Sequence, residues 1–171
     1  TGIGVVGIAT GALEVDAVRL TATAGSGGII LAVIGDIVID TASLSVDRVD
    51  SLGSLTTTDE VAQSDLTATG DGLIVLQTTG SIIINDGDDD DDEGVRADGA
   101  GNVGFEATGD VTLNAGVNSG NGSVNVMADG AVTQANGGDI ISGGSVLVDA
   151  GSGAITMTTG TVTQTNGGNI R

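Results

Sequence analysis

The sequence predicts an all-β protein, a parallel β-helix (β-solenoid) with irregular loop insertions. Three observations indicate this fold class. Short segments rich in Val, Ile and Thr alternate between apolar and polar residues, as half-buried strands do, and no segment has helical periodicity. The sequence also repeats itself internally. Finally, the 171 residues include 31 Gly, no Pro and a single aromatic residue, so the interior must be thin and aliphatic. The lack of Pro suits interior strands, because Pro cannot donate a ladder hydrogen bond.

The clearest internal repeat lies near the C-terminus. Residues 132–140 (VTQANGGDI) recur as residues 162–170 (VTQTNGGNI), with seven of nine positions identical at an offset of 30 residues. Looser pairs join residues 13–18 to 44–49 and residues 20–23 to 66–69. Self-similarity of this kind is typical of solenoids, in which each repeat packs on its neighbours.

One repeating unit accounts for these pairs. It consists of an alternating strand of about five residues, a glycine, a second alternating strand and a turn rich in Asn, Asp and Gly. The unit occurs five times, with central glycines at Gly35, Gly80, Gly109, Gly130 and Gly160. The spacings of 45, 29, 21 and 30 residues suit rungs with loops of different size. Six or seven such rungs, at about 4.8 Å each, would form a rod of roughly 30 Å.

The elements are expected to form one solenoid over residues 1–171. Asn136 and Asn166, each followed by two glycines, are expected at rung corners that need positive φ, and stacked asparagines there would form a ladder. The expected order is N-terminal rungs (1–49), an irregular loop or rung (50–65), a rung (66–85), an acidic loop (86–101) and C-terminal rungs (102–171).

The composition excludes most catalytic chemistry. The chain has no His and no Cys, so it lacks the side chains of catalytic triads, zinc sites and iron–sulfur centres. Paired carboxylates also hydrolyse glycosides, but Phe105 and four scattered Arg cannot build the aromatic platforms and basic clamps that sugar sites usually offer. We therefore expect a protein that is not an enzyme.

The charge and hydropathy of the chain exclude further partners. The 23 acidic and four basic residues give a net charge of −19, which makes nucleic acid and anionic membrane surfaces poor partners. The longest apolar run, residues 29–34, is far shorter than the roughly 20 residues that span a bilayer. We therefore expect no nucleic-acid binding and no membrane insertion.

An acidic run supplies the main candidate site. It comprises seven carboxylates within eight residues: Asp86, Asp88, Asp89, Asp90, Asp91, Asp92 and Glu93. Calcium is the natural ligand, because it is a hard cation that binds several oxygens and tolerates irregular geometry. The run is not an EF-hand, whose loop needs Gly at its sixth position and Glu at its twelfth. Counted from Asp86, this chain has Asp91 and Ala97 at those positions. The alternative is a solvated, mutually repelling loop that keeps the rod soluble.

Three segments connect the chain to a known family. Residues 109–116 (GDVTLNAG), 144–151 (GSVLVDAG) and 35–40 (GDIVID) resemble the repeats of filamentous-haemagglutinin-like giant exoproteins and related large bacterial surface adhesins. The resemblance covers roughly residues 28–40 and 72–171. It implies a right-handed parallel β-helix, secretion by a Gram-negative bacterium and a role as a stalk or adhesive fibre. It implies no catalytic residues, since the repeats of that family have none.

The C-terminal residues stay in register with the repeat. The chain runs through TVTQTNGGNIR without the polar capping segment that closes most solenoids. We expect the end rungs to stack on adjoining repeats of a longer chain or on copies of the same chain. The predicted function is a stiff, acidic, extracellular rod, as a segment or subunit of a bacterial fibre or surface adhesin. The alternative is a calcium-dependent binding solenoid for a surface, a glycan or ice. The motif that suggests ice is the set of Thr-x-Thr rows Thr156/Thr158, Thr161/Thr163/Thr165, Thr21/Thr23 and Thr67/Thr69.

Overall fold

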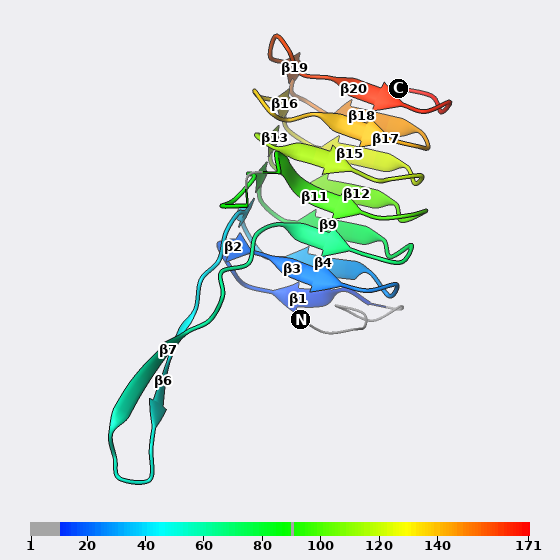
Figure 1. Ribbon diagram of the computed structural model, residues 1–171. Helices are drawn as coiled ribbons and strands as arrows, with labels where there is room; N and C mark the ends of the chain where they lie inside the picture. Colours follow the sequence, from blue (N-terminus) through cyan, green and yellow to red (C-terminus); the bar gives the residue numbers. More distant parts are fainter. Residues whose placement is uncertain (1–10, 90) are drawn as a thin grey trace.

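The chain is a stack of β-rungs (Figure 1). The structure, a computed structural model, describes residues 11–89 and 91–171, so the first ten residues and Asp90 lie outside the described part. The described residues form three parallel sheets of six strands each, with no helix, and each turn of the chain adds one strand to every sheet. The prediction of a parallel β-helix is therefore confirmed. Within the described residues, no helix has the length and apolar character needed to cross a membrane.

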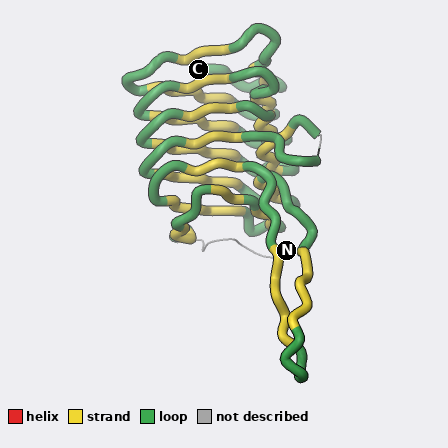
Figure 2. Tube along the Cα trace, turned by 90° about the vertical axis from the view of Figure 1, so that its left-hand side faces the viewer, coloured by secondary structure: helices red, strands yellow, loops and turns green. Residues whose placement is uncertain are grey.

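Each rung contains three short strands. Figure 2 shows the corners that join them and the longer insertions that leave the stack in two of the rungs. The first sheet contains β1 (Leu13–Val15), β4 (Ile29–Val33), β9 (Ile74–Thr78), β12 (Val103–Ala107), β15 (Val124–Ala128) and β18 (Val146–Ala150). The second sheet contains β2 (Arg19–Leu20), β5 (Ile37–Ile39), β10 (Ile82–Ile84), β13 (Val111–Leu113), β16 (Val132–Gln134) and β19 (Ile155–Met157). The third sheet contains β3 (Ala22–Ala24), β8 (Leu66–Ala68), β11 (Glu93–Ala97), β14 (Gly116–Asn118), β17 (Ile140–Ser142) and β20 (Thr163–Thr165).

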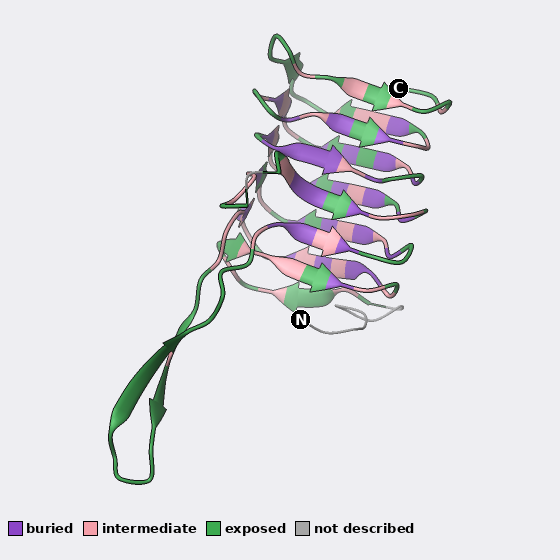
Figure 3. Cartoon of the chain, viewed as in Figure 1, coloured by how far each residue is buried: buried purple, intermediate pink, exposed green. Residues whose placement is uncertain are grey.

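The core is a set of aliphatic columns along the rod axis. On the first sheet, parallel register places like residues above one another, because alternate side chains of each strand point inward. Figure 3 shows buried positions alternating with intermediate or exposed ones along strands of the inner rungs. Phe105, only 1% exposed, stacks between Leu76 and Val126. Another inward column consists of Ile29, Ile74, Val103, Val124 and Val146.

Glycine is required where successive rungs touch. At the positions concerned, an added Cβ would lie less than 3.0 Å from an atom of the preceding rung, in most cases a backbone atom. Any side chain there would push neighbouring rungs apart, so these sites explain much of the high glycine content. The first glycine column contains Gly72, Gly101, Gly122, Gly144 and Gly168, and the second contains Gly80, Gly109, Gly130 and Gly153.

The strongest sequence repeat does not follow the rung period. Gly153, not the predicted Gly160, packs against Gly130 in the second glycine column, so the prediction for Gly160 is wrong. Residues 132–134 pair with residues 155–157 in the second sheet, whereas residues 163–165 lie in the third sheet. The repeated segment thus forms the corner between the second and third sheets at its first occurrence. At its second occurrence it leads from the third sheet to Ile170, which bridges to Val146 of the first sheet.

Asparagine has a different role from the one predicted. Among the described residues, Asn136 and Asn166 do not have positive φ, and the following glycines, Gly137 and Gly167, adopt it instead with φ of 91° and 95°. Glycine reaches this region without the steric cost that a Cβ imposes.

A polar ladder does form, at the corner that follows the second sheet. Asn114 Nδ2 donates to Asn85 Oδ1 at 2.9 Å, and Asn85 Nδ2 donates to Asp40 Oδ2 at 3.1 Å. Ala135 takes the next place in this column, because Leu113 pairs with Gln134, so Asn136 does not continue the ladder. Asn136 and Asn166 do not stack on each other, because they occupy different corners of the rung.

Residues 45–59 form a hairpin arm, not a rung. Strands β6 (Ser45–Val49) and β7 (Leu55–Asp59) pair antiparallel, and in both Figure 1 and Figure 2 the arm extends past β1 at the N-terminal end of the stack. The prediction of a rung up to residue 49 is therefore wrong. Residues 50–65 lie outside the regular rungs, and they include strand β7 of the hairpin, which was not predicted. Every residue of β7 is exposed, since the segment LTTTD has no apolar face to turn inward.

The acidic loop is shorter than predicted. It ends at Asp92, because Glu93–Ala97 is strand β11, which pairs with β8 and β14. The prediction of an acidic loop over 86–101 is wrong for this reason. The predicted repeating unit of two strands is also incomplete, because each rung has a third strand. The third-sheet strands were missed because several are three residues long and turn small residues such as Ala24 and Ala68 inward.

Candidate cation site

The acidic loop folds over the third sheet beside the base of the hairpin arm. It leaves the second sheet after β10 and returns at β11, while the arm returns to the stack at Gln63 and enters β8 at Leu66. Between them lies a hollow of about 330 Å³. Its lining comprises Thr23, Gln63, Ser64, Asp65, Thr67, Asp89, Asp91, Glu93 and Arg96.

Asp65 is the buried carboxylate of this hollow. The residue is 5% exposed and has a φ of 66°, a conformation that Asp adopts more readily than most residues. Its backbone carbonyl accepts a hydrogen bond from the Ala22 amide at 2.9 Å, which fixes it between the first two rungs. Its side-chain atom Oδ1 is buried without a hydrogen-bond partner. A buried polar atom of this kind is unusual, because burying an unpaired carboxylate is costly.

Two carboxylates of the acidic run converge on Asp65. Side-chain oxygens of Asp65, Asp89 and Asp91 all lie within 4.8 Å of one another. Burial raises the pKa of Asp65 from 3.8 to about 8, and the charge of Asp89, a hydrogen bond to it and the charges of other loop carboxylates add to the rise. In the part of the chain that the structure describes, this is the one group of three carboxylates close enough to share an ion.

The acidic run divides into different roles. Asp89 and Asp91 belong to the three-carboxylate group, whereas Asp86, Asp88, Asp92 and Glu93 do not. Asp90 lies outside the described residues.

Glu93 is engaged elsewhere. It accepts hydrogen bonds from Arg96 Nη1 at 3.2 Å and from Asn118 Nδ2 at 2.8 Å. The predicted calcium ligands are thus reduced to two aspartates from the loop and one from outside it.

The backbone atoms of the loop hold its shape. The Asp88 amide donates to Ser64 Oγ at 3.3 Å, the Glu93 amide donates to Asp91 Oδ1 at 2.9 Å, and the Asp92 carbonyl accepts from the Gly116 amide at 2.8 Å. These contacts connect the loop both to the base of the arm and to the next rung. The arrangement can bind a hard cation through carboxylate oxygens.

Asp65 is the site residue that the sequence did not reveal. It stands 24 residues before Asp89, beyond the hairpin arm and in a different rung. The register Leu66↔Val95 brings the two segments together, because the residues before these positions then lie at the same corner. A three-strand reading of the rung would have aligned Ser64 and Asp65 with the end of the acidic loop.

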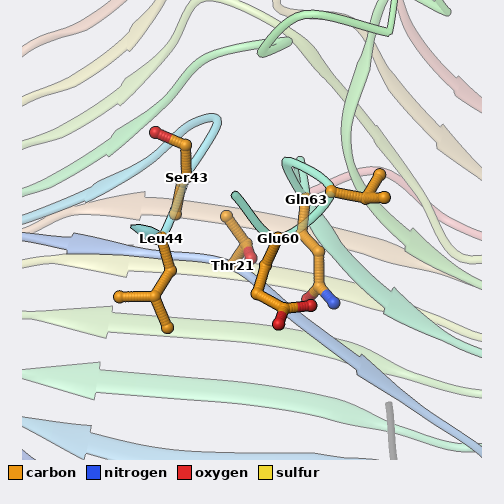
Figure 4. Close-up of a pocket in the computed structure, with 7 residues that line it drawn as sticks. Thr21, Ser43, Leu44, Glu60 and Gln63 are labelled. Carbon is orange, nitrogen blue, oxygen red and sulfur yellow. The ribbon is translucent and has the colours of Figure 1, made fainter. Parts of the chain in front are cut away.

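A second hollow lies at the base of the arm (Figure 4). It has a volume of about 650 Å³, and its lining comprises Thr21, Ala42, Ser43, Leu44, Glu60, Val61 and Gln63. Glu60 is the only carboxylate in that lining, so the hollow lacks the pair of carboxyl groups used in glycoside hydrolysis. Gln63 lines both hollows, so the two are neighbours at the base of the arm.

Comparison with known proteins gives no match: no family model, curated protein or solved structure matches this chain. The resemblance to filamentous-haemagglutinin-like repeats therefore stays a prediction.

Proposed function

We propose that this chain is a structural segment of a bacterial extracellular fibre or surface adhesin, in which it serves as a stiff, acidic β-rod. The observation that carries the proposal is the continuous hydrogen-bonded ladder on all three sides of the stack. Each rung is held by parallel pairing above and below, so bending the rod would require breaking ladders on at least one side. The extracellular location rests on the family resemblance.

The C-terminal rung favours a role in which rungs are added. Strands β19 and β20 are the last of their sheets among the described residues, while β18 pairs with the residues around Ile170; open strand edges such as those of β19 and β20 bind further strands. Ile155 and Met157, which face the interior side of the rung, are 52% and 48% exposed at this end. A further rung of similar sequence would cover them, whether it comes from an adjoining repeat or from a second copy of the chain.

The acidity of the chain supports the same role. A net charge of −19 makes the sides of neighbouring rods repel each other, while the apolar residues at the end of the stack remain attractive. Association is thereby directed along the axis, and a contact of this kind that does not close produces a fibre.

Electron microscopy of the purified chain tests the proposal. We expect rods that extend end to end, and we expect Ile155→Lys to shorten them, because it places a charge on the stacking surface. Thr156→Lys is the matched control, since it adds the same charge to the outward face of the same strand. Compact or flexible particles in place of rods would contradict the structural role, and equal lengths for the two variants would contradict end stacking.

A binding role is the second candidate, and the hairpin arm favours it. Val49, Leu52 and Leu55 are 65%, 90% and 68% exposed around the tip of the arm, where an adhesive contact could form. The threonine rows favour ice less, because Thr163 and Thr165 pair with the inward residues Ile140 and Ser142. Binding to glycan arrays, measured with calcium and with chelator for the full chain and for a chain lacking 45–59, tests this candidate.

A further inference from the structure

We propose that Asp65, Asp89 and Asp91 form a binding site for one divalent cation, with the ligand preferences of calcium, that fastens the base of the hairpin arm to the acidic loop. The site does not depend on fibre formation, because all three residues lie in one chain and outside the C-terminal rung of β18, β19 and β20.

Asp65 supplies a buried carboxylate oxygen that no donor satisfies. Its Oδ1 has no hydrogen-bond partner, although the residue is 5% exposed and its side chain lies beside the two loop carboxylates. A buried carboxylate oxygen of this kind is stabilised by a proton or by a cation. Since Asp89 and Asp91 add two more acceptors and no donor, a cation satisfies all three groups at once.

The three carboxylates are compact enough to contact one ion. Side-chain oxygens of Asp65, Asp89 and Asp91 all lie within 4.8 Å of one another, and two oxygens bound to one Ca²⁺ at 2.3–2.6 Å are at most about 4.6–5.2 Å apart. Calcium is favoured over magnesium because it tolerates an irregular set of oxygen ligands, whereas Mg²⁺ demands near-ideal octahedral geometry and usually keeps several waters.

The positive charge beside the site is already engaged by other carboxylates. Arg96 lines the same hollow, but its guanidinium is engaged by Asp98, at 2.8 Å from Nε, and by Glu93, at 3.2 Å from Nη1. The arginine therefore neutralises the carboxylates that flank the site. The three-carboxylate group keeps its negative charge and attracts a cation.

The consequence of binding is mechanical. Asp65 lies two residues after Gln63, whose backbone pairs with Ala42 at the base of the arm. Asp89 and Asp91 belong to the loop between the second and third sheets. An ion held by all three would tie the third sheet at β8 to the loop that enters β11. We therefore expect cation binding to order the acidic loop and to stiffen the base of the arm.

Isothermal titration of the chelator-stripped full chain with CaCl₂ tests the proposal, in salt high enough to screen diffuse binding to the acidic surface. We expect one saturable site per chain and a weakening of at least about tenfold in Asp65→Asn, equivalent to 1.4 kcal/mol. Asp88→Asn is the matched control, because it removes one charge from the same loop outside the three-carboxylate group. We expect it to bind calcium nearly as the unaltered chain does.

Two results would overturn the proposal. One is the absence of a saturable calcium site, and the other is equal weakening by Asp65→Asn and Asp88→Asn, which would reduce the binding to the general charge of the loop. Asp89→Asn, at an exposed loop position, gives the same test without altering a buried residue, and we expect it to lose the site too. Far-UV circular dichroism of each variant establishes that the β-helix is retained.

Discussion

Replacing Gly122 by Ala tests whether close contact between rungs limits this fold. Gly122 lies in the first glycine column, and a Cβ added to it would lie 2.0 Å from Gly101 O and 2.5 Å from Gly101 C. Both are backbone atoms of the rung below, so no side-chain rotation relieves the clash. The two rungs must separate at that corner, next to the strands β12 and β15, which are paired along all five residues.

The size of the effect follows from the atoms involved. Overpacking a well-packed interior typically costs about 1–3 kcal/mol, and a rigid backbone obstacle places Gly122→Ala near the upper end, about 3 kcal/mol. Gly104→Ala is the matched control. Its nearest neighbour would be Val75 Cγ2 at 4.0 Å, an ordinary contact. Ala is favoured over Gly in a strand by about 0.5–1 kcal/mol, so we expect this control to be stabilised.

Thermal unfolding followed by circular dichroism measures the difference, since the chain has no Trp or Tyr for fluorescence. A gap of about 4 kcal/mol between the two variants corresponds to about 8–16 °C for a chain of this size. Equal melting temperatures, or a Gly122→Ala variant more stable than the unaltered chain, would refute the explanation of the glycine columns.

Four further predictions concern the site, the core and the arm. The folded pKa of Asp65, about 8, exceeds the unfolded value of 3.8, so without cation the stability it contributes is complete below about pH 4 and is lost as the pH rises through about 8. After allowance for solvent screening, we expect the free energy of unfolding in urea to fall by about 2 kcal/mol between about pH 5 and pH 9. We expect no such fall in Asp65→Asn. Phe105→Ala should lower stability to urea by about 3–5 kcal/mol, because it empties the column between Leu76 and Val126. Asn85→Ala should cost about 1–2 kcal/mol in the same assay, since it breaks both hydrogen bonds of the polar ladder. Removal of residues 45–59 should change the melting temperature by less than about 4 °C, because the arm is exposed and lies outside the rungs; a larger drop would show that it supports the stack.

The fold class was predictable because its signal is repeated along the chain. Alternation in segments such as Ile29–Val33 and Val124–Ala128 appears in the observed burial patterns, where inward and outward residues take turns. The third strands were not predictable in the same way. Ala22–Ala24 has no large apolar residue, and its place in a sheet depends on its pairing with Leu66–Ala68, 44 residues further on. The arm was missed because the similarity of residues 13–18 to 44–49 suggested a rung.

The candidate site was predictable only in its loop half. Seven carboxylates in eight residues stand out in any sequence, and two of them reach the three-carboxylate group. Asp65 is a single acidic residue before a short strand, and nothing local distinguishes it from Asp71 or Asp110. Its role depends on burial and on the register between β8 and β11, which are properties of the stacked rungs. Such long-range proximity cannot be derived from spacing along one chain.

The nine-residue segment that serves two different corners says something about how such a rod can lengthen. Residues 132–140 and 162–170 are nearly identical, yet one joins the second sheet to the third and the other leads from the third sheet back to the first. Val132 points inward, whereas in the second occurrence Thr163 pairs with the inward Ile140, so the inward and outward positions are exchanged at the start of the segment. A duplicated stretch of gene therefore need not match a whole turn to be accommodated. Growth by tandem duplication is open to inserts of many lengths, as long as each brings a strand and a glycine corner.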